Sequence, residues 1–383
     1  MFQNMHFSVW HYVSGTVSTR LLSKSEAANV LEKLERFGPW TRLGKLSPAT
    51  RLDELLKKAK RQLLIGLLEA TSGQGFEKII ENDFANLGGQ SQKRFVAIVG
   101  LATIHRLPLR VALLQRALTI LGVSESVDVL IHATAGVISR SGDAVTARHQ
   151  IYIEHLFERV LDNEQKAEAI HALLHGFSVY EAPLLVSVGK LAATLFKLTV
   201  NHKFLRNSFH GNEGYVLRVY EAFEKAFQSD GLFWLQYGLA LRDFDRQDEA
   251  LDRLRTARIA YPSLQTEHAL AQQQLILARR NKRDRTLAYA MLGEAKDALM
   301  RLDARRQEFE TDYPIDSLSE GHVEIARTFE GLPAARKLSG EYANILSERM
   351  RTETLNPRFR DTWKRLSVFA TGGRWKAERQ DAS

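Results

Sequence analysis

The stretch GLFWLQYGLALRDFDRQDEALDRLRTARIAYPSL, residues 231–264, decides how the second half of this chain folds. Apolar residues recur at helical spacing on both sides of the polar turn DRQD. The small residues Gly238 and Ala250 allow two antiparallel helices to approach closely, and Ala257 leaves room for a following hairpin. Pro262 ends the second helix without removing one of its hydrogen bonds. The stretch therefore predicts a helical hairpin that packs against further hairpins.

These positions match the tetratricopeptide repeat, a helical hairpin of roughly 34 residues. Its signature positions are occupied by Trp234, Gly238, Ala250, Ala257 and Pro262. A single repeat cannot bury its faces alone, so neighbouring hairpins are required. The segments 216–230, 266–280 and 288–302 match the repeat less closely, and they indicate about three hairpins in all. A plain helical hairpin of similar composition is the alternative interpretation.

Residues 1–88 predict an N-terminal helical unit. Ser25 is placed to cap a helix over EAANVLEKLERF, which a Gly-Pro pair ends. A second helix begins after Pro48 and continues to the TSGQG break at residues 71–75.

Residues 89–150 carry a different pattern. Three short helices are expected after Gly89, Pro108 and Ser124. The segment VISRSGDAVTAR then places β-prone runs on both sides of a Ser-Gly-Asp turn, which indicates a β-hairpin. Three helices and a hairpin describe a winged helix, so the expected fold class is mainly α with one small hairpin. The other predicted segments are a helical linker or bundle at 151–213, tetratricopeptide-like repeats at 214–335, and a capping helix with a frayed tail at 336–383.

The composition excludes several classes of protein. The 383 residues include no cysteine, which rules out disulfides, thiolate nucleophiles and cysteine-ligated metals. The 53 Lys and Arg against 45 Asp and Glu give a net charge of +8, which favours acidic partners without establishing nucleic-acid binding. The N-terminus lacks the pattern of a secretory signal, and the most apolar stretch, 182–200, is interrupted by a proline and two lysines. We therefore expect a cytoplasmic protein without membrane association.

The segment ARHQIYIEHLF follows the predicted hairpin and resembles the end of the winged-helix domain in STAND signal-transduction ATPases. Arg148 and His149 carry this resemblance, because a histidine often follows the wing in that family. LSKSEAANVLEKLERFG and RQLLIGLLEATSGQGFEKII resemble the lid-region helices that precede the winged helix in bacterial STAND proteins linked to phage defence. The order of lid, winged helix and helical repeats, over residues 20–330, is also that of the family.

The resemblance implies a regulatory or sensor region. In the family, a nucleotide-binding core precedes this region, and the repeats sense a ligand or partner. This chain has no G-x-x-x-x-G-K-[ST] motif, and its nearest glycine cluster, TSGQGFEK, lacks both the spacing and the Lys-Ser/Thr pair. ATP or ADP is therefore expected only in a partner or a longer parent protein, and this chain is expected to need no cofactor. His149 would sense the nucleotide of a docked core, the competing interpretation being a helix-capping or core histidine.

Three further groups of residues are candidates for binding sites. His171 and His175 lie one helical turn apart, but Ala172 stands where a zinc protease needs its catalytic Glu, so we expect no metal site. Basic residues that could reach DNA phosphates from a winged helix are Arg106, Arg110, Arg116, Arg140 and Arg148. The third predicted helix, SESVDVLIHATAG, contains no Lys or Arg, which favours docking to protein.

Two basic stretches lie in the C-terminal part. The first joins two predicted helices, and its candidate contacts with an acidic partner are Arg279, Arg280, Lys282 and Arg283. A solvated loop is the alternative for this stretch. The second, NPRFRDTWKR, includes Phe359 and Trp363, which indicate a terminal capping helix rather than a base-stacking surface.

The sequence therefore predicts a non-catalytic module that binds a protein or peptide through its repeats, as the regulatory part of a STAND-type signalling or antiviral system. No nucleophile, base and orienting group can be assembled from its local motifs. Two alternatives remain open, a stand-alone repeat adaptor and a nucleic-acid-associated regulator that uses the basic surface.

Overall fold

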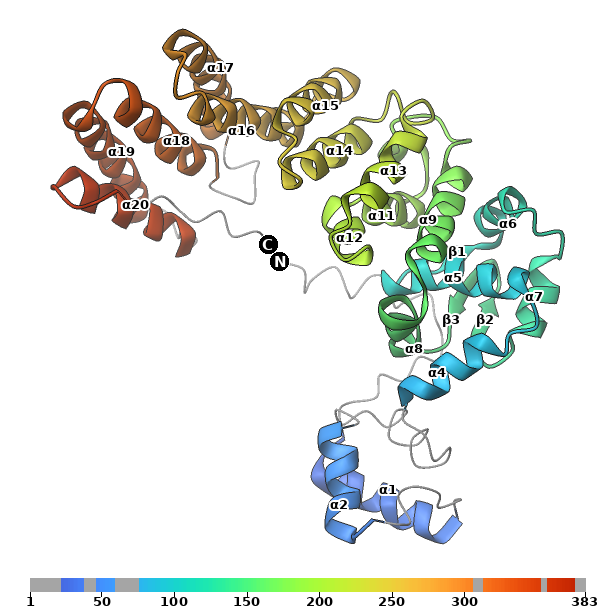
Figure 1. Ribbon diagram of the computed structural model, residues 1–383. Coiled ribbons are helices and arrows are strands. Elements are labelled where there is room, and N and C mark those ends of the chain that lie inside the picture. Colours follow the sequence, from blue (N-terminus) through green and yellow to red (C-terminus); the bar gives the residue numbers. More distant parts are fainter. Residues whose placement is uncertain (1–21, 38–45, 59–75, 306–312, 353–356, 376–383) are drawn as a thin grey trace. The chain divides into compact units, whose positions relative to one another are not determined.

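The computed structural model describes residues 22–37, 46–58, 76–305, 313–352 and 357–375. These residues are mostly helical and include one small three-stranded sheet (Figure 1), which confirms the mainly α class. Contacts divide the chain into two compact units, Met1–Gly176 and Phe177–Ser383, and the division falls within the segment predicted as a linker or bundle. None of the described helices is both long enough and apolar enough to span a bilayer.

The first unit opens with short helices. They are α1 (Lys24–Phe37), α2 (Pro48–Asp53), the π-helical turn η4 (Glu54–Lys58) and α4 (Phe76–Ala85). The cap of α1 is Ser23 rather than Ser25, because the Ser23 hydroxyl accepts from the Glu26 N–H at 3.2 Å and the Glu26 carboxylate accepts from the Ser23 N–H at 2.7 Å. These two reciprocal hydrogen bonds need a serine three residues before the glutamate. Ser23 has that spacing from Glu26 and Ser25 does not. The predicted continuation of the second helix beyond residue 58 lies outside the described residues.

The sheet lies among three helices. In chain order these elements are α5 (Gln90–Ile104), β1 (Leu109–Arg110), α6 (Val111–Ile120), α7 (Val127–Ala133), β2 (Ile138–Ser141) and β3 (Ala144–Ala147). The strand order is β1-β3-β2, and both pairings are antiparallel, with Leu109 opposite Val145 and Ile138 opposite Ala147. The predicted hairpin is confirmed, and Gly142 turns its loop at a φ of 60°.

Two predicted boundaries in this region are wrong. The helix expected from Pro108 begins at Val111, because Leu109 and Arg110 pair with β3 instead. The cap of α7 is Ser126, whose hydroxyl accepts from the Val129 N–H, rather than Ser124. Thr103 joins α5 to the sheet, since its hydroxyl accepts from the Ala147 N–H at 3.1 Å and donates to the Val99 carbonyl at 3.0 Å.

Three helical segments complete the first unit. They are α8 (Gln150–His155), the π-helical turn η5 (Leu156–Val160) and α9 (Asn163–Phe177), whose last residue opens the second unit. A Cβ on Gly100 of α5 would lie 2.9 Å from the Phe157 ring and 3.1 Å from Ile153. The glycine therefore lets this segment pack directly onto α5.

The second unit begins with α10 (Leu184–Ser187), α11 (Lys190–Thr199), α12 (His202–Ser208) and α13 (Glu213–Phe223). Its aromatic core includes Phe196 and Tyr220, which contact Phe227 and Phe233 edge to face. Asp230, fully buried, joins the first of these helices to the next element. One carboxylate oxygen accepts from the Phe233 N–H and the other from the Leu184 N–H, both at 2.9 Å.

Three helical hairpins and a final helix follow. They are α14 (Gly231–Asp243) with α15 (Gln247–Ala260), α16 (Leu264–Arg280) with α17 (Arg285–Ala304), α18 (Tyr313–Phe329) with α19 (Leu332–Thr352), and α20 (Pro357–Ala370). The boundary predicted after residue 335 falls inside α19. Phe359 and Phe369 of α20 are buried against the third hairpin, and Trp363 is partly buried there.

Small residues set the packing within the hairpins. A Cβ on Gly238 would lie 2.7 Å from Leu254 Cγ and 3.3 Å from the Ala250 carbonyl oxygen, so α14 and α15 meet almost backbone to backbone. Ala250, Leu254 and Ala257 are buried on α15. The same residue types at the same spacing, Ala288, Leu292 and Ala295, are buried on α17. The chain therefore repeats one packing surface in two successive hairpins.

The first helices of the hairpins lie closer together than the second helices. α14 contacts α16, and α16 contacts α18, whereas α15, α17 and α19 make no comparable contact with one another in the described residues (Figure 1). The row of hairpins therefore curves, with α14, α16 and α18 on its inner side.

Candidate functional site

Several separate hydrogen bonds and ion pairs between polar side chains join the first helices of the row to one another and to α12 and α20. We call this set the inner ladder, and its members are Arg206, Asp243, Arg242, Gln272, Gln273, Ser317, Arg279, Glu324, Glu320 and Arg365. These residues come from α12, α14, α16, α18 and α20. The ladder is therefore built by side chains far apart in the sequence.

The first rung joins α12 to α14. The backbone N–H of His202 and its ring Nδ1 lie 3.1 and 2.8 Å from the same Gln236 amide oxygen, so Nδ1 carries the proton. Its Nε2 lies 3.7 Å from an Asp243 oxygen that also lies 3.7 Å from Arg206. Burial lowers the pKa of His202 below its usual value, although the Gln236 bond and the Asp243 charge oppose the shift. The ring is therefore held as a neutral, oriented imidazole.

Arg242 forms the second rung, between α14 and α16. Its guanidinium donates to the Gln273 side-chain oxygen at 2.8 Å, to the Ala269 carbonyl at 2.7 Å and to the Gln272 side-chain oxygen at 3.4 Å. Burial lowers the pKa of Arg242 to about 10, with Asp243 opposing, so the group stays charged near neutral pH. Its cationic donors are thus used within the row.

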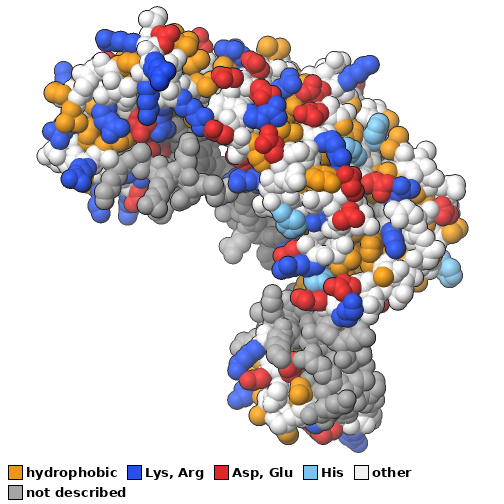
Figure 2. Space-filling view, viewed as in Figure 1, with side chains coloured by type: hydrophobic (Ala, Val, Ile, Leu, Met, Phe, Trp, Pro, Cys, Tyr) orange, Lys and Arg blue, Asp and Glu red, His pale blue; other side chains and the backbone are white. Residues whose placement is uncertain are grey.

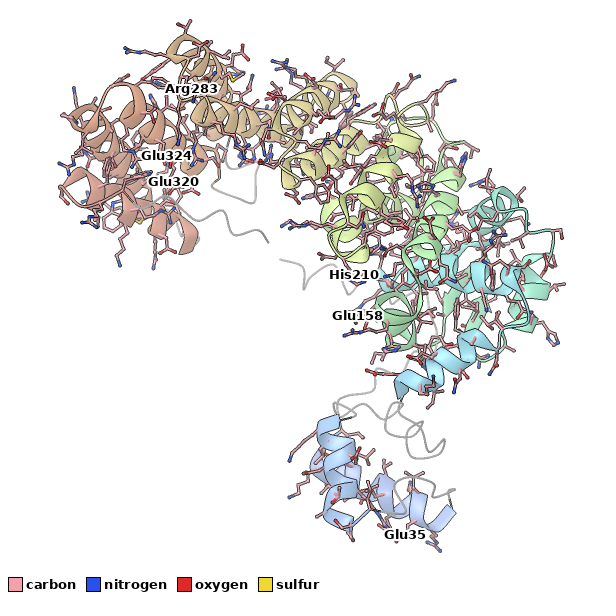
Figure 3. The ribbon with its side chains drawn as sticks, in the orientation of Figure 1. Glu35, Glu158, His210, Arg283, Glu320 and Glu324 are labelled. Carbon is pink, nitrogen blue, oxygen red and sulfur yellow. The ribbon has the colours of Figure 1, made fainter. Side chains whose placement is uncertain are left out.

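The third rung joins α16 to α18 and α20. The Gln272 amide donates to the Ser317 hydroxyl at 3.0 Å. Arg279 forms an ion pair with Glu324, which also accepts from the Trp375 indole at 3.3 Å. Arg365 Nε donates to Glu320 at 2.7 Å. Figure 3 labels Glu320 and Glu324, which lie one turn apart on α18.

The cations of the inner ladder are engaged by acceptors that also belong to the row. Arg242, Arg279 and Arg365 are each engaged by an acceptor from another helix of the row. On the face shown in Figure 2, basic and acidic side chains are likewise interspersed. The ladder therefore links successive hairpins, and its charged groups are paired within the row.

His149 occupies the position before the first turn of α8, and its side chain makes no hydrogen bond with that turn. The residue is partly exposed to solvent. Its partial burial and the neighbouring Arg148 cation lower its pKa. The His149 side chain therefore does not cap α8.

The structure divides the candidate acidic-partner contacts into two pairs. Arg279 and Arg280 form ion pairs with Glu324 and Asp245, so they are engaged within the fold. Lys282 and Arg283 are exposed on the loop between α16 and α17.

The candidate DNA contacts are also divided. Arg140 forms an ion pair with Asp128 of α7, and Arg116 donates to the Gly176 carbonyl at 3.2 Å. The other three, Arg106, Arg110 and Arg148, are exposed. The two candidate metal ligands, His171 and His175, both lie on α9. Among the residues that the structure describes, no group of three or more His, Asp or Glu is placed to hold a metal ion.

The repeat-signature positions lie in the packing of the first hairpin. Trp234, Ala250 and Ala257 are buried, and Pro262 is exposed just after α15. The inner ladder and Asp230 were not found by sequence reasoning. For Asp230, the available signal is an acidic residue directly before a helix, which is the pattern of an N-cap.

No protein-family model, no curated protein and no solved structure matches this chain.

Because of His268 in α16, we expect the free energy of unfolding to fall in acid. Burial and the nearby Arg242 lower the pKa of His268 from 6.5 to about 4. The unfolded chain binds a proton at His268 more tightly than the folded chain does. The stability that neutral His268 contributes is therefore complete above about pH 6.5, and it is lost as the pH falls towards 4. We expect H268Q to remove about 2 kcal/mol of this acid sensitivity. Urea unfolding of both proteins from pH 7 to 4.5 measures it, and parallel curves would contradict the prediction.

Proposed function

We propose that this chain is a non-catalytic sensor or regulatory module that binds a protein partner on the inner side of a tetratricopeptide-like row. The observation that carries the proposal is the repetition of Ala250, Leu254 and Ala257 by Ala288, Leu292 and Ala295, together with the curvature that brings the first helices side by side. Curved rows of helical hairpins present extended inner surfaces to peptides and proteins.

The first unit supports a second part of the proposal. Its order of helix, strand, two helices and hairpin, with strand order β1-β3-β2, is the arrangement that we propose as a winged helix. The exposed face of α7 carries Asp128, Val129 and His132, and Asp128 engages Arg140 of the wing. A helix that meets DNA needs cations for the phosphates. This face therefore favours docking to protein.

The resemblance to STAND proteins supplies the proposed context. A nucleotide-binding partner or parent core would dock near the exposed His149, and partner binding on the row would release or restrain that core. The cofactor, ATP or ADP, would belong to the core.

The test is affinity capture with the tagged full chain from its native cells, at moderate salt. The inner-face variant L239E/I276E changes a leucine and an isoleucine, both partly buried, that share the helical faces of Arg242 and Gln272. The matched control, I259E/M300E, changes two exposed apolar residues of the second helices, 79% and 46% exposed. We expect one defined protein to be captured by the wild type and the control and lost by the inner-face variant.

The identity of the captured protein separates the alternatives. A P-loop ATPase supports the STAND-type sensor, and a different single protein supports the stand-alone adaptor. Capture of nucleic acid and its usual companions alone, or equal capture by both variants, would sink the proposal.

A further inference from the structure

The loops of the first and third hairpins are each tied to a helix of the middle hairpin. The first, after α14, contains Asp245, which pairs with Arg280 at the end of α16. The third, after α18, contains Glu330, which accepts from the Tyr289 hydroxyl of α17. The carboxylates on both sides of the middle loop, Asn281–Asp284, are therefore engaged by groups of the row.

The middle loop is itself held in place. The Asp284 carboxylate accepts from the Leu287 N–H at 2.9 Å and so caps α17. The Asn281 side chain accepts from the Asp284 N–H at 3.2 Å. The acidic group within the loop is thus used for capping, and the loop conformation is set before any partner arrives.

Two cations of this loop have no acidic partner among the described residues. Lys282 and Arg283 are exposed, and neither makes an ion pair or a side-chain hydrogen bond with the described residues. Arg283 is labelled in Figure 3 on the loop that joins α16 to α17. Arg285, also exposed, stacks its guanidinium 5.5 Å from the centre of the Tyr289 ring. Beside them, Leu287 is 43% exposed in the first turn of α17.

We propose that this basic loop, defined by Lys282, Arg283, Arg285 and Leu287, binds a short acidic segment of the protein partner, with an apolar residue of that segment placed on Leu287. The inference rests on the proposed partner binding by the row. The contrast with the inner ladder carries it, because Arg242 and Arg279 are engaged by neighbouring helices whereas Lys282 and Arg283 are available. Free cations on a pre-formed loop steer and orient an acidic partner.

A nucleic acid fits this loop less well. Its backbone carries a charge about every 3.4 Å along each strand, and the carboxylates of Asp245 and Glu330, bonded to α16 and α17, would oppose an extended strand of that charge. The Tyr289 ring, which a base would need for stacking, is covered by Arg285. A short acidic segment avoids both conflicts.

The experiment measures binding of a fluorescein-labelled peptide of Asp-Glu-Leu-Glu repeats to the full chain by anisotropy. The loop variant is K282E/R283E, and the matched control is R360E/K364E, which makes the same charge change at two exposed residues of α20. We expect the loop variant to lose about 10-fold or more in affinity, and the control to lose about 2-fold or less. Circular dichroism checks that both variants are folded.

Three results would overturn the inference. They are no binding of the peptide by the wild type, an equal loss in the two variants, or tighter binding of a single-stranded oligonucleotide of equal charge. The partner captured from cells separates this inference from the proposed function. If L239E/I276E loses that partner and K282E/R283E keeps it, the loop inference fails and the proposed function stands.

Discussion

Replacing Asp230 with alanine is expected to destabilise the second unit by about 2–4 kcal/mol. The change removes the N-cap of α14, which is worth about 0.5–2 kcal/mol. It also leaves the N–H of Leu184, a buried residue, without its acceptor, at a cost of about 1–3 kcal/mol. Urea unfolding of the full chain, followed by tryptophan fluorescence, measures the loss, because Trp234 lies in the first turn of α14.

Two further variants sharpen this prediction. D230N keeps an oxygen for the cap but turns an amide N–H₂ towards the Leu184 N–H, so we expect a loss smaller than that of D230A. D297A removes an exposed carboxylate of α17 and should change stability by less than about 0.5 kcal/mol. Equal losses for D230A and D297A would show that the buried carboxylate does not hold α10 to α14.

Adding one methyl group at Gly238 is expected to have a comparable effect. A Cβ there would lie 2.7 Å from Leu254 Cγ and 3.3 Å from the Ala250 carbonyl oxygen, so α14 and α15 must separate. Overpacking of this kind costs about 1–3 kcal/mol, which exceeds the helix propensity gained by the change. Hydrogen exchange of peptides from α14 and α15 locates the loss within the chain.

Gly293 provides the opposite case. It lies in α17, and a Cβ there would meet nothing within 4 Å. G293A should therefore stabilise the protein by about 0.5–1 kcal/mol, because alanine restricts the unfolded chain and favours the helix. Destabilisation by G293A, or stabilisation by G238A, would contradict this account of the hairpin packing.

The first hairpin was predictable because its information is local. Gly238 and Ala250 mark the close approach, and polar residues mark the turn, so periodicity and residue size suffice. The β2–β3 hairpin was found for the same reason, from Gly142 and its β-prone flanks. Strand β1 was missed because two residues give no periodicity, and its conformation depends on Val145 and Ala144, which lie far along the chain.

The candidate site was less accessible to sequence reasoning. The basic run was recognised, but the sequence could not show that Arg279 and Arg280 are engaged by Glu324 and Asp245. Those pairs depend on how hairpins stack, which is set by tertiary packing. The partners of Arg242 were hidden for the same reason. Side-chain spacing within one helix does not report which residues of the next helix it will meet.

The inner ladder also gives the row unequal mechanical stiffness. Flattening the curve would stretch the bonds from Arg242 to Gln273 and from Gln272 to Ser317, whose optimum length is narrow. Tightening the curve would instead press Gly321 of α18 onto Leu275 of α16, where a Cβ on the glycine would lie 2.5 Å from the leucine side chain, and closely packed side chains resist compression. The row therefore resists both straightening and further bending. A long rigid ligand that straightens it must supply the free energy from its own binding.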